Sequence, residues 1–467
     1  MGHPVIGLDL GVTAPSEIAV ASGSEVESTH KVSSTHKGLT EGIRRAAKGR
    51  TVAIVVESTA MAWFVAAVAA LRADIDHTMY RVSGAKAAAL RAFYRAHTKT
   101  DRIDARVLAR MPAVDDTLRR FTLPEPSELA LKRLVVLRHK LTVERTKIQN
   151  RIRSTLHWAA PGLVKETGGS VSLGLLAVLK RWPDLRSLAR ARSATVAREA
   201  RWNEARAERA VAAAAAATEF YGDLVDFIAV ALELEVACAQ LDALDAQTRR
   251  LEERIAQMHA QRYPDDVLLT IPGIGAVVAG VIRAIVGDLS RFANLAALRA
   301  FTGLVPRENS SGEARRRGRI SKAGPSVLRW ALYLAADVAR QWDPQLADLY
   351  RRLMVERGHT HTQALCAVAS HLVGRIWAVA RENRPYQWRD LNGNAISRDR
   401  ARALALALRV DPDTRMRLRA RRYGEPGTPR TRQPVAPQDV TRLSEDDLTE
   451  IALRITQHVR EGVLDKA

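Results

Sequence analysis

The sequence predicts an α/β domain at the amino end, followed by a helical middle segment and a mainly helical C-terminal region. Short apolar and β-branched runs alternate with helical patterns up to about residue 115. From "PEPSELALKRL" onward, apolar residues recur with helical spacing. At 467 residues, the chain is long enough for several domains with cores of their own.

Buried strands covered by helices are expected in the first domain. The runs "PVIGLDLGV" and "TVAIVVEST" are nearly continuous in apolar residues, which is typical of strands with both faces covered. Between them, "SEIAVAS" and "EVESTHKVSS" fit a pair of hairpin strands. The helices of this domain are expected at about residues 38–49, 60–73, 84–95 and 100–110.

The middle of the chain reads as long helices. After a stretch that ends in "RIRSTLHWAAPG" and a second over about 172–218, "LELEVACAQLDALDAQTRRLEERIAQMHA" has heptad spacing. About four heptads fit either a coiled coil that forms a dimer or tetramer, or a bundle helix within one chain. The two seams are Leu234, Leu241, Thr248 and Ile255, and Ala237, Leu244, Leu251 and Met258.

A new domain opens at "YPDDVLLTIPGIG", in which helices flank a Gly- and Arg-rich loop. Basic helical sequence follows, then the linker "GEPGTPRTRQPVAP" and an amphipathic helix that Ser444 caps. We therefore expect an α/β domain at 1–120, a helical linker and coiled coil at 121–260, a C-terminal domain with a serine loop at 261–390, and a basic extension at 391–467.

The charge of the chain predicts a polyanionic partner. There are 72 Lys and Arg against 51 Asp and Glu, and most of the basic residues are Arg, which binds phosphate with two parallel hydrogen bonds. The two cysteines, Cys238 and Cys366, form no disulfide framework or cysteine zinc site, which fits a reducing cytoplasm. No secretion signal is expected at the start, and the run "MAWFVAAVAAL" is too short to span a bilayer.

Four carboxylates form the strongest chemical pattern. Asp9 stands alone in one apolar strand, and Glu57 ends another. Asp101 and Asp104 are one helical turn apart in "KTDRIDARVLA", so they share a face and repel each other. If the strands are neighbours and the helix packs across their ends, the four acids converge into an all-oxygen site for two divalent cations, which can act on a phosphodiester. The simpler alternative is that Thr100 caps the helix and its dipole favours the two acids.

A second pattern is a serine in a strongly basic segment. Nearby arginines favour the ionised form of a hydroxyl and the charge of a phosphoryl transition state, so Ser311 can act as a nucleophile; a passive turn that binds the DNA backbone is the alternative. Gly273 and Gly275 in "PGIG" fit either a phosphate-binding helix hairpin or a structural turn. The basic residues around Ser311 are Arg307, Arg315, Arg316, Arg317, Arg319 and Lys322.

The order of the four acids resembles that of ribonuclease H-like nucleases, in particular the Holliday-junction resolvases. "KTDRIDARVLA" looks like the signature of the DEDD transposases of bacterial insertion sequences. "IPGIGAVVAGVIRAIVGDLSRF", "FTGLVPRENSSG" and "RGRISKAGPSVLRWAL" resemble the C-terminal transposase domain of that family in order and spacing. The resemblance covers most of residues 5–390.

This resemblance implies a RuvC-like first domain, with Mg2+ in a two-metal site formed by Asp9, Glu57, Asp101 and Asp104. It implies that Ser311, rather than the adjacent Ser310, joins covalently to a DNA end, with the carboxylate domain assisting across a dimer. It also implies a noncoding bridge RNA that pairs with the element ends and the target DNA, and a cytoplasmic, nucleoid-associated protein with no membrane partner. The sequence departs from the family at "ESTAMAWF" and "RVSGAK". The rival predictions are a metal-dependent junction nuclease and an inactive nucleic-acid-binding relative.

Overall fold

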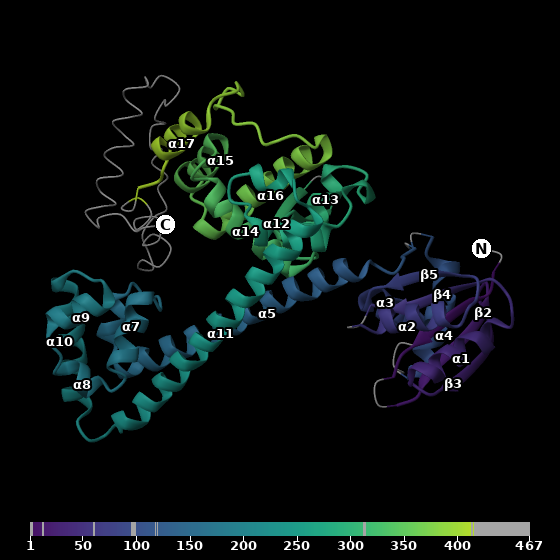
Figure 1. The fold of residues 1–467 in the computed structure, drawn as a ribbon, viewed down its shortest axis with the longest axis horizontal. Coiled ribbons are helices and arrows are strands. Elements are labelled where there is room, and N and C mark those ends of the chain that lie inside the picture. Colours follow the sequence, from purple (N-terminus) through teal and green to yellow (C-terminus); the bar gives the residue numbers. More distant parts are fainter. Residues whose placement is uncertain are drawn as a thin grey trace. The chain divides into compact units, whose positions relative to one another are not determined.

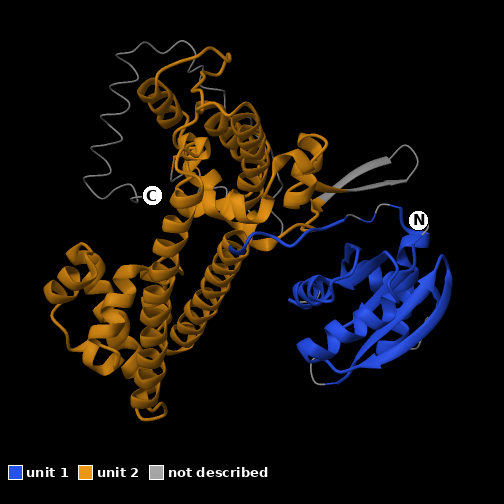
Figure 2. Ribbon diagram, turned by 45° about the vertical axis from the view of Figure 1, so that its right-hand side comes forward, with its two compact units in different colours: residues 1–126 blue, residues 127–467 orange. Residues whose placement is uncertain are grey.

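The computed structural model describes residues 3–11, 14–58, 61–94, 100–116, 118, 120–311, 314–411 and 414. For residues 308–311 and 314–318 it describes the backbone alone. The chain divides into two compact units, residues 1–126 and 127–467 (Figure 2). The predicted Pro-rich linker and the helix after Ser444 lie outside the described residues.

The first unit is built on a mixed five-stranded sheet in the order β3-β2-β1-β4-β5 (Figure 1). β1, β2 and β3 are antiparallel, whereas β1, β4 and β5 are parallel. The predicted α/β character of this region is therefore confirmed. The strands are β1 (Val5–Asp9), β2 (Ser16–Ser22), β3 (Glu25–Val32), β4 (Val52–Glu57) and β5 (His77–Val82).

Helices cover both faces of this sheet. α3 and α4 share a buried cluster with Val5 and Val55, which lie on one face. α1 contacts Ile18 on the other face, since Gly42 of α1 lies against that side chain. All four predicted helices are present, although α1 begins before and α4 ends after its predicted range: α1 (His36–Ala47), α2 (Ala62–Arg72), α3 (Gly84–Tyr94) and α4 (Asp101–Val114).

The backbones of α4 and β1 are in direct contact at Gly7. A Cβ at Gly7 would overlap the Ala105 carbonyl oxygen and the Ala109 backbone nitrogen. Ala105 and Ala109 are themselves fully buried against the sheet. Because residues 7, 105 and 109 are all small, the backbone of α4 packs directly on β1. This close packing determines where the two acids in the first turn of α4 lie.

We expect Gly7→Ala to loosen the contact between α4 and β1. Because the added methyl meets backbone rather than a movable side chain, we expect a loss of about 3 kcal/mol and about a hundredfold faster amide exchange in β1 and α4. Hydrogen exchange with mass spectrometry measures this. The control is Gly23→Asn, in the turn after β2, where space is open and φ is +62°, a conformation that Asn tolerates. Equal exchange in the two variants would contradict the packing role of Gly7.

Two long antiparallel helices, α5 (Pro126–Ala159) and α11 (Phe227–Arg262), run through the second unit (Figure 1). Arg138 pairs with Glu252, and Arg145 pairs with Asp245 at 2.6 Å. Five shorter helices share a core with the ends of α5 and α11 that include Leu156 and Leu234. They are α6 (Pro161–Glu166), α7 (Leu173–Arg181), α8 (Leu185–Ala189), α9 (Ser193–Ala200) and α10 (Glu204–Tyr221).

The predicted heptad seam is packed within this chain. Leu234, Ala237, Leu241 and Ile255 are all buried by neighbouring helices of the same unit. At these four positions, the segment therefore behaves as a bundle helix within one chain, which was the alternative to an intermolecular coiled coil.

The rest of the second unit forms a separate helical core. α16 is long and apolar enough to cross a membrane by length and composition. Its Val368 and Leu372 are fully buried in this core, as in the core helix of a water-exposed domain. The elements are η1 (Val267–Thr270), α12 (Ala276–Val286), η2 (Leu289–Arg291), α13 (Leu295–Thr302), α14 (Ser326–Ala339), α15 (Pro344–Arg351), η3 (Arg352–Glu356) and α16 (His361–Glu382).

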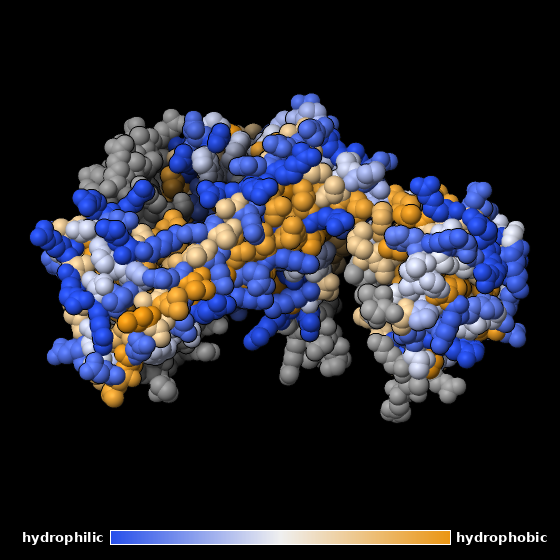
Figure 3. Space-filling view, turned by 60° about the horizontal axis from the view of Figure 1, so that its bottom comes forward, coloured by the Kyte–Doolittle hydropathy of each residue, from blue (hydrophilic) through white to orange (hydrophobic). Residues whose placement is uncertain are grey.

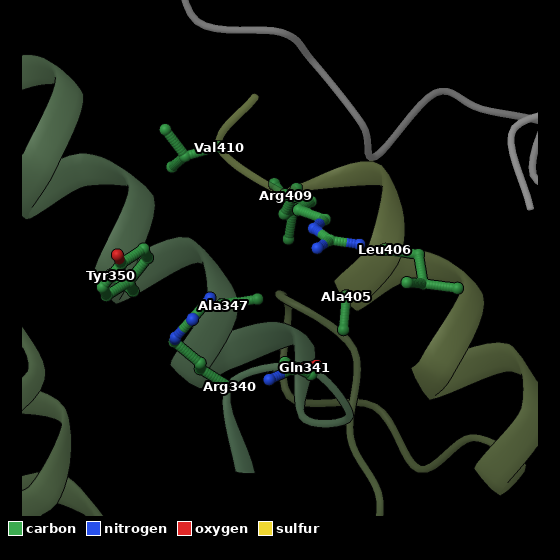
Figure 4. Close-up of a pocket in the computed structure, with 9 residues that line it drawn as sticks. Arg340, Gln341, Ala347, Tyr350, Ala405, Leu406, Arg409 and Val410 are labelled. Carbon is green, nitrogen blue, oxygen red and sulfur yellow. The ribbon is translucent and has the colours of Figure 1, made fainter. Parts of the chain in front are cut away.

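The first part of the predicted basic extension packs onto this core. α17 (Arg398–Ala407) lies against α15, and a small pocket between them is lined by residues that include Arg340, Tyr350 and Arg409 (Figure 4). Arg398 and Arg402 both stack on Trp342. Residues up to 411 are thus part of the folded unit.

The prediction of a loop around Ser311 was wrong. Two antiparallel strands, β6 (Pro306–Ser311) and β7 (Ala314–Ile320), pair as a hairpin on either side of residues outside the described chain, with Ser311 paired to Ala314. The segment is rich in Arg, Ser and Gly and lacks alternating apolar residues. Strand prediction depends on that alternation, so the sequence carries little signal for this hairpin.

Candidate active site

Asp9 and Glu57 lie side by side at one edge of the sheet. β1 and β4 are parallel neighbours, with Leu8 opposite Val56. Asp9 and Glu57 are the next residues and end the two strands. Residues in register on neighbouring strands point to the same face, and such strands are about 4.8 Å apart. The predicted convergence of these two carboxylates thus has a structural basis in the strand register.

The first turn of α4 brings Asp101 and Asp104 toward the same edge. Arg110, in the third turn of α4, donates a 2.9 Å hydrogen bond to the Ser24 carbonyl in the turn between β2 and β3. That turn lies beside the amino end of β1. The first turn of α4 therefore lies toward the carboxyl end of β1, where Asp9 is located.

Thr100 caps α4, as the simpler alternative for this stretch predicts. Its side chain accepts a 3.3 Å hydrogen bond from the Ile103 backbone nitrogen. Asp101 and Asp104 follow in the first turn, where the helix dipole favours carboxylates. The capped helix end explains why two acids are tolerated in this turn. Because the cap determines where the helix begins, it also determines the positions of Asp101 and Asp104 on it.

α3 lies against two of the four acids. Arg91 donates a 2.7 Å hydrogen bond to Asp104, and the two side chains are only 21% and 13% exposed. The first residue of α3, Gly84, lies so close to Glu57 that a Cβ there would be 2.8 Å from Oε1. In the described part of the chain, no three His, Cys, Asp or Glu side chains are arranged to hold a metal ion. The structure thus brings Asp9 and Glu57 together on neighbouring strands and pairs Asp104 with Arg91.

The sequence analysis missed a fifth acid at this edge of the sheet. Glu17 of β2 is directly opposite Asp9 in the antiparallel register and is only 5% exposed. In "SEIAVAS" it reads as an ordinary polar residue near the start of an outer hairpin strand. Only the pairing of β2 with β1 brings it beside Asp9.

The second group of predicted residues belongs to the β6–β7 hairpin of the second unit. Ser310 and Ser311 end β6, next to Gly312, which lies outside the described residues. Arg315, Arg316 and Arg317 are on β7, where the backbone alone is described. Arg307, Arg319 and Lys322 near the base of the hairpin are exposed.

Backbone contacts hold the base of this hairpin. Gly303, at φ +70°, ends α13, and a Cβ there would lie 2.7 Å from the Gly324 nitrogen. Arg329 of α14 donates 2.9 Å and 3.4 Å hydrogen bonds to the carbonyls of Gly324 and Thr302. The hairpin is therefore joined to α13 and α14 through two glycines and one arginine.

The two glycines of "PGIG" differ in their surroundings. Gly273 has φ +82°, and a Cβ there would overlap the Ala335 carbonyl oxygen of α14. Gly275 caps α12 and has nothing within 4 Å of its Cβ position. Gly273 thus has a packing reason to be glycine, whereas the space beside Gly275, at the amino end of a helix, is open.

A buried ion network holds this turn in place. Asp266 accepts hydrogen bonds from His259 at the end of α11 (2.9 Å) and from Arg283 of α12 (2.6 and 2.9 Å). Burial alone would raise the pKa of Asp266, but the hydrogen bonds from His259 and Arg283 outweigh it and hold the pKa well below its usual value. The network ties α11, η1 and α12 together around the glycine turn.

Because the pKa of Asp266 is lowered in the folded chain, its stabilising contribution is present above the unfolded pKa of about 3.9 and is lost as the pH falls below it. We expect Asp266→Asn to cost about 3 kcal/mol near neutral pH and to remove this part of the acid sensitivity. Thermal unfolding from pH 3 to pH 7 measures both effects. A variant that keeps the acid sensitivity of the wild type would contradict this role of Asp266.

Two family models match the chain over ranges that include both groups of residues. A model of DEDD transposases of the IS110 type, described as "Transposase", matches residues 6–161, which include the four acids. The model described as "Transposase IS116/IS110/IS902 family" matches residues 265–351, which include the hairpin.

Relatives with names match much of the chain. The 44.8 kDa protein of insertion element IS116 from Streptomyces clavuligerus is 28% identical over 312 residues, which cover 66% of this chain and 75% of that protein. The 43.6 kDa protein of insertion element IS110 from Streptomyces coelicolor is 28% identical over 306 residues, 63% and 74% of the two chains. A pilin gene-inverting protein of Moraxella lacunata is 30% identical over 128 residues, 27% and 40% of the two chains. The chain therefore belongs to the IS110 family of DEDD transposases, as a DNA transposase of an insertion sequence.

Proposed function

We propose that this transposase cuts and rejoins DNA strands with a metal-bound carboxylate cluster and a serine nucleophile, guided by a noncoding bridge RNA. The observation that carries the proposal is the position of the acids at one edge of one sheet. Asp9 and Glu57 end neighbouring parallel strands, and Asp101 and Asp104 start the helix that packs on them. This arrangement favours a ribonuclease H-like (RuvC-like) fold for the first unit.

The DEDD family uses a divalent metal, commonly Mg2+, and the donor set fits it, because all four side chains offer the carboxylate oxygens that hard cations prefer. Asp9, Glu57, Asp101 and Asp104 would hold it, in a two-metal site. When bound, the metal would stabilise the attacking and leaving oxygens of the phosphodiester. Arg91 pairs with Asp104 at 2.7 Å and would orient that carboxylate beside the metal.

Ser311 is the proposed nucleophile. Its Oγ would attack the phosphorus, a bond from phosphorus to a DNA oxygen would break, and the DNA end would stay on the protein as a phosphoserine ester. Attack on this ester by the hydroxyl of a second DNA strand would release Ser311 and join the two strands. Basic residues would stabilise the added negative charge of the transition state.

Nucleic acid would be held by the basic hairpin and by the amino end of α12. The exposed Arg307, Arg319 and Lys322 support this role, and Gly275 leaves room for a phosphate at the amino end of α12. Gly273, Arg315, Arg316 and Arg317 complete the proposed set. The excess of basic residues suits both the DNA and a structured RNA.

A homo-oligomer, dimer or tetramer, is also part of the proposal. Exposed apolar side chains lie at the end of α10, in the turn that follows and along the start of α11, and hydrophobic surface follows the long helices in Figure 3. A second copy would cover them. They are Phe220, Leu224, Ile228, Leu232 and Val236.

Four functional segments within the two units are part of the proposal. They are the DEDD domain at 1–120, the helical linker and coiled coil at 121–260, the serine-bearing domain at 261–390 and the basic extension at 391–467. The proposed location is the cytoplasm, at the nucleoid, with no membrane partner.

The test is to purify the protein from cells that carry the flanking DNA of its gene and to sequence the RNA that comes with it. A single abundant RNA with loops matching the element junction and the insertion site would support guided recombination. Cleavage of branched DNA with Mg2+ alone, and no discrete RNA, would favour the junction nuclease. Metal-independent binding without strand transfer would favour an inactive relative.

A further inference from the structure

Arginines gather on α7, α8 and α9, three short helices of the second unit (Figure 1). Residues 180–201, from the end of α7 to just after α9, contain seven basic residues against two acidic ones. One of these acids, Asp184, is used as the cap of α8. The two family models match residues 6–161 and 265–351, so this positive charge lies outside the segments with the four acids and the hairpin.

The packing of α7 on α9 brings three of these arginines together. A Cβ on Gly174, in the first turn of α7, would lie 2.6 Å from the carbonyl oxygen of Ala200 at the end of α9. Because the two helices pack against each other and have similar lengths, their opposite ends also lie together. Those ends carry Arg181 and Arg192, and Arg190 at the end of α8 is two residues before Arg192. All three side chains are exposed, and we call them the arginine patch.

The arginine patch forms no ion pair within the described residues, although neighbouring basic side chains do. Lys180 pairs with Asp242 at 2.5 Å, and Arg209 pairs with Glu166 at 2.8 Å. The three guanidinium groups of the patch repel one another when no anion is bound, because they carry the same charge. An anion from outside the chain would remove this repulsion.

Local structure accounts for two members of the patch but not for the third. Arg181 is in the last turn of α7 and Arg190 ends α8, where the helix dipole favours a cation. Arg192 is the N-cap of α9, and its side chain makes no capping hydrogen bond. Ser, Thr, Asp and Asn are favoured at an N-cap, and the dipole there repels a cation. The position of Arg192 therefore needs an explanation outside its own helix.

We propose that the arginine patch binds the phosphate backbone of duplex DNA, as a surface separate from the hairpin and from the amino end of α12. A duplex carries one negative charge per about 1.7 Å of its axis, so three neighbouring arginines can contact several phosphates. Each guanidinium can bind a phosphate with two parallel hydrogen bonds. Duplex DNA is the polyanion that a transposase must hold. The inference requires only this activity, so it is independent of the proposed metal site, serine and RNA.

The salt dependence of DNA binding tests the inference. The full-length protein, free of nucleic acid and divalent metal, is titrated with a labelled duplex of mixed sequence at several salt concentrations. We expect Arg181→Gln, Arg190→Gln and Arg192→Gln together to weaken binding about thirtyfold, and to lower the slope of log affinity against log salt by about three. Lysine at all three positions keeps the charge and should keep the slope. An unchanged slope in the glutamine variant would overturn the proposal.

A second triple variant controls for the loss of overall charge. Lys147→Gln, Arg209→Gln and Arg384→Gln together remove the same charge from exposed side chains that already pair with carboxylates. This variant should bind DNA within about twofold of the wild type. Equal weakening in the two triple variants would show that net charge, not the patch, holds the DNA. A larger loss of affinity for duplex RNA than for duplex DNA would assign the patch to RNA and would also overturn the proposal.

Arg192→Ser separates DNA binding from a structural role. Serine is a favoured N-cap, so we expect the Tm to rise by about 2 °C. DNA binding should weaken about threefold, because one phosphate contact is lost. If Arg192 only supports the fold, the variant would instead have a lower Tm and would bind DNA as the wild type does.

Discussion

Ser311→Ala is expected to abolish strand joining. Removal of the proposed nucleophile should lower recombination by at least about a thousandfold, because binding and electrostatics alone cannot replace a nucleophile. The assay is recombination of a reporter plasmid that carries the element ends and the target, together with capture of the DNA–protein adduct on a denaturing gel.

Ser310→Ala is the matched control for this experiment. Ser310 precedes Ser311 on β6 and pairs with Arg315 in the hairpin register. We expect it to keep recombination within about threefold of the wild type, as for a residue outside the chemical step. An adduct that persists in Ser311→Ala and disappears in Ser310→Ala would show that Ser310 is the nucleophile. Absence of an adduct in every protein would favour metal-dependent cleavage without a serine.

Asp9→Asn is expected to abolish metal-dependent recombination, again by at least about a thousandfold. The amide has the same shape as the carboxylate but no charge, so it is a poor ligand for a hard cation. Asp9 ends β1 in the middle of the sheet, between β2 and β4, so the substitution removes the central carboxylate of the proposed site. Recombination is measured over a range of Mg2+ and Mn2+ concentrations.

Asp74→Asn serves as the control for the loss of a carboxylate. Asp74 is exposed in the turn after α2, at φ +55°, where asparagine is well tolerated. It should recombine DNA as the wild type does. Normal activity of Asp9→Asn at ordinary Mg2+ concentrations would remove Asp9 from the proposed site.

The outlines of both regions could be read from the sequence. The runs around Asp9 and Glu57 predicted buried strands, and the helix from residue 101 was expected from its spacing and cap. These features are local, since periodicity and capping act over a few residues. The family signature in "KTDRIDARVLA" is local as well, and the family matches confirm it.

The hairpin and the heptad segment show where local reasoning fails. The β6–β7 strands carry no apolar alternation, so pairing of the two backbones was invisible in the sequence. Heptad spacing on α11 predicts an apolar seam but does not identify what covers it. Here other helices of the same chain bury Leu234 and Leu241, while the exposed Ile228 and Leu232 lie outside the predicted seam.

From the sequence alone, the four acids and the serine can be proposed as site residues. The strands of Asp9 and Glu57 and the helix of Asp101 and Asp104 can be predicted as well. What only the tertiary structure decided is their surroundings: α4 held against Gly7, Arg91 paired with Asp104, and Glu17 placed opposite Asp9. The reason is physical. Residue type and spacing determine local conformation, whereas strand register and helix crossing depend on contacts between segments that are distant in sequence.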